Sequence, residues 1–280
     1  MVYSGQTLVF DTSAINALCD DEDVNSIVTR IGKSYDVSIT ETVLEEVIAD
    51  PEEGERRRLL ELVGRFLHSG CCIMPFHWII EHQAKAYWGD RCCYAWRNVD
   101  VRFLEAEREI REQSVIHGLS GQTKKHNKAA DEEYCAIFSR ARPRFQRLFT
   151  RDKERPPLQD FVQHLLSPGG AYLSWAADLM KRATGSRPSE TEAKEFIDRC
   201  PPFNALLVAL GISQYDRCVR EDGKCWVGRA GRNDMFSAVY LPYCHVFVTN
   251  DLGQKKALQE VVNLTALPTV ILMHGEFKST

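Results

Sequence analysis

Four acidic residues stand where predicted strands and helices of the chain meet. Asp11 directly follows an early apolar run, and Asp251 follows a late one. Glu46 lies one turn into the helix predicted after a second early run, and Asp234 opens the helix that precedes the late run. In open parallel sheets, ligands bind beyond the carboxyl ends of the strands. If these strands are neighbours, the four carboxylates converge on one rim of the sheet.

Carboxylates that converge in this way favour the binding of a divalent cation. Like charges raise one another's pKa, and a cation relieves that repulsion. Hard oxygen ligands suit Mg²⁺ or Mn²⁺, which keeps several waters and completes its shell with substrate phosphate. A bound metal ion lowers the pKa of a water and stabilises the leaving oxygen. The four acids therefore predict metal-dependent hydrolysis of a phosphodiester bond.

The elements that must position these acids lie at the two ends of the chain. Short apolar runs there alternate with amphipathic helical patterns, which is typical of a parallel sheet covered on both faces. The runs occupy residues 7–10, 37–40, 245–249 and 269–273. We predict an α/β fold, a three-layer α/β/α sandwich with a central parallel sheet, built from residues 1–51 and 229–280.

Residues 52–228 have a different character. Apolar residues recur there at helical spacing, and no strand pattern of comparable quality is found. One of these helical stripes is expected to break at Pro143. The sequence therefore predicts a mostly helical insertion within the α/β fold.

Four segments resemble the PIN-domain nucleases. They are residues 9–15 (VFDTSAI), 39–47 (ITETVLEEV), 233–239 (NDMFSAV) and 246–251 (VFVTND). The family has an acid after the first strand, a Glu in the helix after the second, a third acid opening a helix and a fourth in a T-x-D context. The last two acids here lie 17 positions apart, close to the family's spacing. The resemblance covers the two ends of the chain and not the helical middle.

The resemblance implies a PIN-like fold and a function for each matched residue. It assigns the metal-binding and catalytic roles to Asp11, Glu46, Asp234 and Asp251. It assigns supporting hydroxyl groups to Ser13 and Thr249. The implied activity is that of a Mg²⁺- or Mn²⁺-dependent endoribonuclease. Family members are often toxins or RNA-processing enzymes, so a toxin or defence role and a protein inhibitor or regulator are analogies to consider.

Each acid also has a simpler interpretation. Asp11 could serve only as the cap of the helix that follows it. Asp251 could be a cap or a turn residue. Asp234 could be a first-turn acid that interacts favourably with the helix dipole. Glu46 competes with Glu41 and Glu45 of the same predicted helix, and the family register favours Glu46. If the acids are only caps, the chain is a non-catalytic RNA- or protein-binding module. A DNA-directed flap-type nuclease is a third hypothesis.

Basic residues supply the candidate contacts to substrate. Residues 121–157 carry ten Lys or Arg against five acids, with aromatic residues among them, which suits either an RNA backbone or a solvated helix face. Arg229 and Arg232 flank Asp234 in a glycine-containing loop. They could hold a phosphate beside the metal ions, or they could belong to a plain flexible loop.

Composition limits the remaining function classes. The 280 residues carry a net charge of −4, which gives no global electrostatic case for nucleic acid. No apolar run approaches the ~20 residues needed to span a bilayer, and the N-terminus lacks the pattern of a signal peptide. The ten cysteines show no C-x-x-C and no zinc-site spacing. We therefore expect a cytoplasmic protein with reduced thiols.

Overall fold

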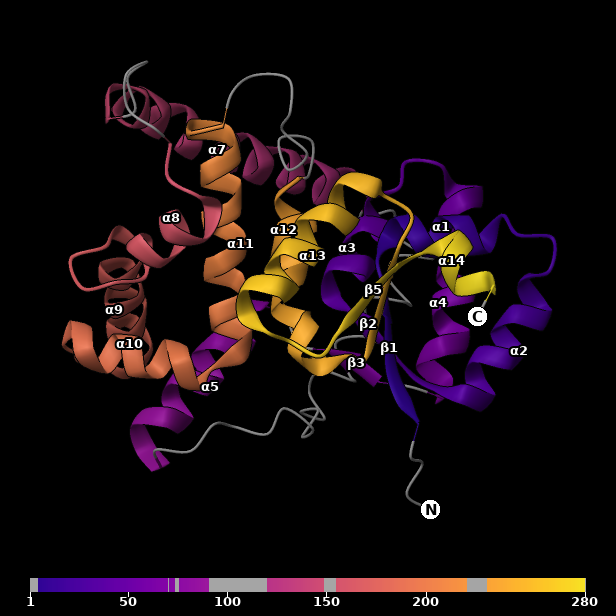
Figure 1. Ribbon diagram of the computed structural model, residues 1–280. Coiled ribbons are helices and arrows are strands. Elements are labelled where there is room, and N and C mark those ends of the chain that lie inside the picture. The colour runs from indigo at the N-terminus through magenta and orange to yellow at the C-terminus, as the bar shows by residue number, and fades with distance from the viewer. Residues whose placement is uncertain are drawn as a thin grey trace.

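The computed structural model describes residues 5–69, 71–73, 76–90, 120–148, 155–220 and 231–279. Its centre is a sheet of five parallel strands (Figure 1). The strands are β1 (Gln6–Phe10), β2 (Tyr35–Thr40), β3 (Cys71–Ile73), β4 (Val246–Thr249) and β5 (Val270–Met273). An α/β fold with a parallel sheet, as the sequence predicts, is confirmed.

Helices form the rest of the described chain. The N-terminal part contains α1 (Thr12–Cys19), α2 (Val24–Ser34), α3 (Glu41–Ala49) and α4 (Glu53–Ser69). The middle contains α5 (Phe76–Asp90), α7 (Ser120–Leu148), α8 (Leu158–Leu165), α9 (Ala171–Thr184), α10 (Glu190–Arg199) and α11 (Pro201–Cys218). The C-terminal part contains α12 (Arg232–Phe236), the 3₁₀ helix η1 (Ser237–Tyr243), α13 (Leu252–Thr265) and α14 (His274–Ser279).

The strand order of the sheet is β3-β2-β1-β4-β5. The chain moves outward from β1 in one direction to β2 and β3, and later returns to place β4 on the other side of β1. Val9 lies opposite Phe247 in this pairing, and Phe10 lies opposite Val248. The strand order thus reverses between β1 and β4, and ligand sites of open α/β sheets form at such a switch point.

Two apolar clusters cover the two faces of the sheet. Leu8 and Phe10 point to one face and pack with residues of α1, α2, α3 and α4. Val9 and Phe247 point to the other face and pack with residues of α11, η1 and α13. This alternation follows from the period of two along a strand. Helices on both faces are compatible with the predicted three-layer sandwich.

The structure corrects two expectations for residues 52–228. The expected absence of a strand there is wrong at β3, which pairs in parallel with β2. Three residues are too short to display a period of two, so the sequence pattern did not reveal β3. The sheet therefore extends past residue 51, and α4 packs beside it, with Phe66 stacked on Phe10 at 5.6 Å between ring centroids. Pro143 lies inside α7, which continues to Leu148 instead of breaking.

The helical middle is joined to the sheet by a shared core. Apolar residues of α11 are almost wholly buried and belong to the same cluster as Val9 and Phe247. Within the ranges described above, none of the helices combines the length and the apolarity that crossing a membrane requires.

Candidate active site

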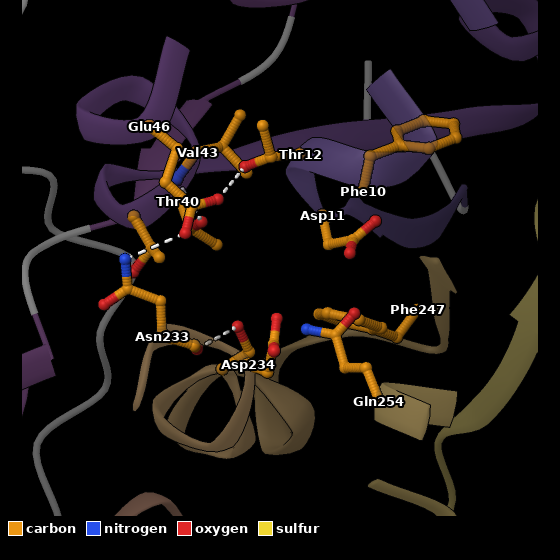
Figure 2. A pocket seen from close by; sticks show the side chains of 12 residues that line it. Phe10, Asp11, Thr12, Thr40, Val43, Glu46, Asn233, Asp234, Phe247 and Gln254 are labelled. Atoms are coloured by element: carbon orange, nitrogen blue, oxygen red, sulfur yellow. Dashed lines mark hydrogen bonds between the residues drawn. The ribbon is translucent and has the colours of Figure 1, made fainter. Parts of the chain in front are cut away.

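A pocket opens at the carboxyl ends of β1, β2 and β4, next to the switch point (Figure 2). Its cavity volume is about 10 Å³, roughly the space of one water molecule. Its lining comes from the two ends of the chain, as the sequence predicts for the acid residues. The lining residues are Phe10, Asp11, Thr12, Thr40, Thr42, Val43, Glu46, Asn233, Asp234, Ser237, Phe247 and Gln254.

Asp11 lies between β1 and α1 and serves two structural roles at once. It is the N-cap of α1, and its Oδ1 accepts a hydrogen bond from the Ala14 backbone N–H at 2.8 Å. Its own N–H donates to the Val248 carbonyl at 3.0 Å, which joins the end of β1 to β4. Only 8% of its surface is exposed. Burial raises the pKa of Asp11 to about 6, although its hydrogen bonds oppose the rise, and the nearby charge of Glu46 adds to it.

The hydroxyl groups of Ser13 and Thr249 surround the Asp11 carboxylate. Ser13 Oγ donates to Asp11 Oδ2 at 2.9 Å, and Thr249 Oγ1 lies 3.0 Å from the same oxygen. Ser13 Oγ also accepts from the Asn250 N–H at 2.7 Å, and Thr249 Oγ1 accepts from the Asp251 N–H at 2.9 Å. Both residues therefore lie where the sequence-based hypothesis needs them, because they hold Asp11 against the end of β4.

Glu46 is the acid of α3 that lines the pocket, whereas Glu41 and Glu45 do not. Both of its carboxylate oxygens accept hydrogen bonds from other lining residues. Thr12 Oγ1 donates to Oε2, and Asn233 Nδ2 donates to Oε1 at 2.8 Å. These two bonds fix the orientation of the carboxylate from two parts of the chain that lie far apart in sequence.

Asp234 approaches the pocket from the side opposite Asp11 (Figure 2). It is the third residue of α12, and its Oδ2 accepts from the Gly231 N–H at 2.6 Å. Gly231 is the N-cap of this helix. Burial raises the pKa of Asp234 to about 7, and the charges of Glu46, Asp11 and Asp251 raise it further.

Asp251 stands apart from the other three acids. It is exposed and is not among the residues that line the pocket. It is the N-cap of α13, and its Oδ1 accepts from the Gln254 N–H at 2.8 Å. The structure therefore brings three of the four predicted acids to one pocket and places Asp251 close enough for its charge to act on Asp234.

The pocket carboxylates have no neutralising cation in the part of the chain that the structure describes. No ion pair joins a Lys or Arg to Asp11, Glu46 or Asp234 among the described residues, and the charges acting on Asp11 and Asp234 are all negative. Glu46 and Asp234 keep oxygen lone pairs that their hydrogen bonds within the described chain do not use. The donor set is thus hard, anionic and uncompensated, which fits a divalent cation.

The acids are not arranged as a closed cage. Across the described ranges, no group of three or more His, Cys, Asp or Glu side chains is placed to hold a metal ion directly. Mg²⁺ usually binds one or two protein carboxylates and keeps several waters. The open arrangement therefore fits that ion better than a metal enclosed by protein ligands.

Of the two predicted phosphate-binding arginines, the one that the structure describes, Arg232, is not in the pocket. Arg232 does not line it, because its Nε lies 3.5 Å from Asp131 Oδ1 and its guanidinium lies 5.8 Å from the centre of the Phe236 ring. Arg229 lies outside the described residues. Of the basic segment 121–157, α7 packs against α3 and α12 and exposes Lys125, Lys128 and Arg140, among other residues.

Sequence reasoning missed several polar residues of the lining, of which three contact the predicted site residues. Thr12 and Asn233 hold Glu46, and Gln254 contacts Thr249. Each stands within three positions of a predicted acid, so adjacency was the signal that could have found them. Polar residues beside candidate ligands often orient those ligands.

Comparison with known proteins adds no identification. The chain matches no model of a known protein family. No curated protein and no solved structure is similar to it at a significant level.

Proposed function

We propose that this protein is a metal-dependent endoribonuclease with a PIN-like fold. The observation that carries the proposal is the meeting of Asp11, Glu46 and Asp234 in one pocket, with no cation from the described chain to neutralise them. Bringing one buried and two partly buried carboxylates together costs stability, so a ligand explains the pocket better than helix capping does. Strongly perturbed carboxylates in a cleft are typical of functional sites.

Sheet topology supports the same proposal. The strand order places the ends of β1 and β4 side by side, and β2 adjoins β1. The first acid follows β1, the second lies in the helix after β2, and the third opens a helix shortly before β4. This order of acids along the chain is the one that the PIN resemblance implies.

The side chains in and around the pocket would have two kinds of role, metal binding and positioning of the metal ligands. Asp11, Glu46 and Asp234 would hold Mg²⁺ or Mn²⁺, and the ion would supply the positive charge that activates water and offsets charge on the phosphate. Ser13 and Thr249 keep Asp11 in place. Thr12 and Asn233 keep Glu46 in place. Asp251 would add negative charge at the rim and attract the cation.

RNA is the proposed substrate, on the strength of the resemblance and of the lysines on α7. Lys125 and Lys128 are exposed on a helix that packs against α3 and α12, the helices that carry Glu46 and Asp234. Basic side chains beside a cleavage site bind the phosphate backbone of a single strand. A toxin or defence role and a regulatory protein partner rest on the resemblance alone.

Metal-dependent cleavage of RNA tests this proposal. We expect the purified protein to cut a fluorescent single-stranded RNA in Mn²⁺ or Mg²⁺, and EDTA to reduce the rate roughly 100-fold or more. A branched DNA substrate should be cut much more slowly. Cleavage that survives EDTA would contradict the metal site, and preferred cleavage of branched DNA would favour the flap-type nuclease. Tight RNA binding with no cleavage in any metal would favour the non-catalytic module.

A further inference from the structure

Gln254 is a buried polar residue of the pocket. It is not one of the proposed metal ligands, and the fold does not need it as a helix cap. It lies in the first turn of α13, and 1% of its surface is exposed. Its Oε1 accepts a hydrogen bond from Thr249 Oγ1 at 2.6 Å. Figure 2 shows its Nε2 turned toward the middle of the pocket, on the side of Asp234.

Helix capping does not explain this side chain. Asp251 and Gln254 have the spacing of a capping box, in which the glutamine side chain would reach back to the N–H of the N-cap residue. Here the Asp251 N–H donates to Thr249 Oγ1 instead, at 2.9 Å. The side chain of Gln254 is thereby released from the cap and directed into the pocket.

The amide nitrogen of Gln254 has no hydrogen-bond acceptor among the described residues. This nitrogen is not one of the fully buried polar atoms that lack a partner among the described residues, so it reaches the pocket, where an accepting ligand atom can bind it. The other side-chain amide in the lining, Asn233, already donates to Glu46. Gln254 is therefore the side-chain N–H of the lining that remains available to a ligand.

We propose that Gln254 binds the reacting phosphate, with Nε2 donating to a non-bridging phosphate oxygen. The inference rests on the proposed nuclease function and deepens it, since it names the side chain that meets the substrate's own charge. Three carboxylates alone would repel a phosphate, and a neutral donor beside them orients it without competing for the metal ion. The contact through Thr249 to Asp11 fixes the amide relative to the acids.

Two substitutions separate the donor from the shape of the side chain. Gln254→Glu keeps the size and an oxygen for Thr249 but replaces the donor by an acceptor. Gln254→Met keeps the size and removes both polar atoms. Gln259→Met is the matched control, because Gln259 lies on the same helix outside the pocket and donates to Asn263 at 3.2 Å.

The experiment measures cleavage of single-stranded RNA and, separately, Mn²⁺ binding by electron paramagnetic resonance. We expect both Gln254 substitutions to lower kcat/KM about 100-fold. Mn²⁺ affinity should stay within about threefold of wild type in Gln254→Met and should not fall in Gln254→Glu, which adds a carboxylate. Gln259→Met should match wild type in both measurements. Thermal unfolding of each variant establishes that it is folded.

Each other outcome overturns the inference in a recognisable way. Wild-type rates in both Gln254 variants would refute the phosphate contact and leave the nuclease proposal standing. A parallel loss of Mn²⁺ binding and activity would make Gln254 a support of the metal site instead. An inactive wild-type protein would refute the nuclease proposal and this inference with it.

Discussion

Replacing Asp11 by Asn is expected to lower RNA cleavage at least about 100-fold while the protein stays folded and becomes more stable above pH 7. Asn caps helices as well as Asp does, so the hydrogen bond from the Ala14 N–H is retained. The neutral amide places no charge at this buried position, where burial raises the pKa of Asp11 to about 6. Removing that charge should increase the free energy of unfolding at pH 8 by roughly 1–3 kcal/mol.

Asp251→Asn is the matched control for this substitution. Both acids are N-caps, but Asp11 lines the pocket and Asp251 is exposed outside it. We expect the Asp251 variant to lose much less activity than the Asp11 variant and to show no comparable gain in stability. Kinetic assays in Mn²⁺ and urea unfolding measure the two effects. Equal activity of wild type and the Asp11 variant would show that Asp11 is only a cap.

The second large effect is a dependence of stability on pH and metal. Burial raises the pKa of Asp11 to about 6 and that of Asp234 to about 7, both from 3.8. The folded state therefore binds more protons than the unfolded state between about pH 4 and pH 7, and stability falls as pH rises through this window. We expect the metal-free protein to lose roughly 3 kcal/mol between pH 5 and pH 8.

Mn²⁺ should restore that stability where the acids are charged. An ion at about 100 times its Kd adds roughly 3 kcal/mol to the free energy of unfolding, and we expect the gain at pH 8 to exceed the gain at pH 5. Urea unfolding with Mn²⁺ and with EDTA measures the difference. A metal-free protein that is more stable at pH 8 than at pH 5, with no response to Mn²⁺, would contradict this account of the pocket.

Local sequence signals predicted most of the sheet and three of the acidic residues that line the pocket. The runs that became β1, β2, β4 and β5 are apolar, bounded by polar residues and long enough to be recognised. Asp11 could be found because it follows a recognisable strand. Glu46 and Asp234 could be found because each lies in a recognisable helix next to a strand. Residues 189–192 (SETE) also have the local pattern of a capping box, which Ser189 and Glu192 form at the start of α10.

The missed features depend on tertiary contacts. β3 has three residues, and its pairing with β2 makes it a strand. Pro143 is accommodated within α7, where sequence rules predict a break. Asp251 was predicted to lie in the site, but Gln254 lines the pocket and Asp251 does not. Thr249 accepts the hydrogen bond from the Asp251 N–H, which leaves the glutamine side chain free of the helix cap. No pattern in the local sequence reports which of two neighbouring polar residues turns inward.

A crystal structure of the protein soaked in Mn²⁺ tests the central claim most directly. The account predicts an anomalous difference peak in the pocket, within bonding distance of at least one oxygen of Asp11, Glu46 or Asp234. Absence of such a peak, with the three carboxylates paired to lysine or arginine side chains, would contradict it.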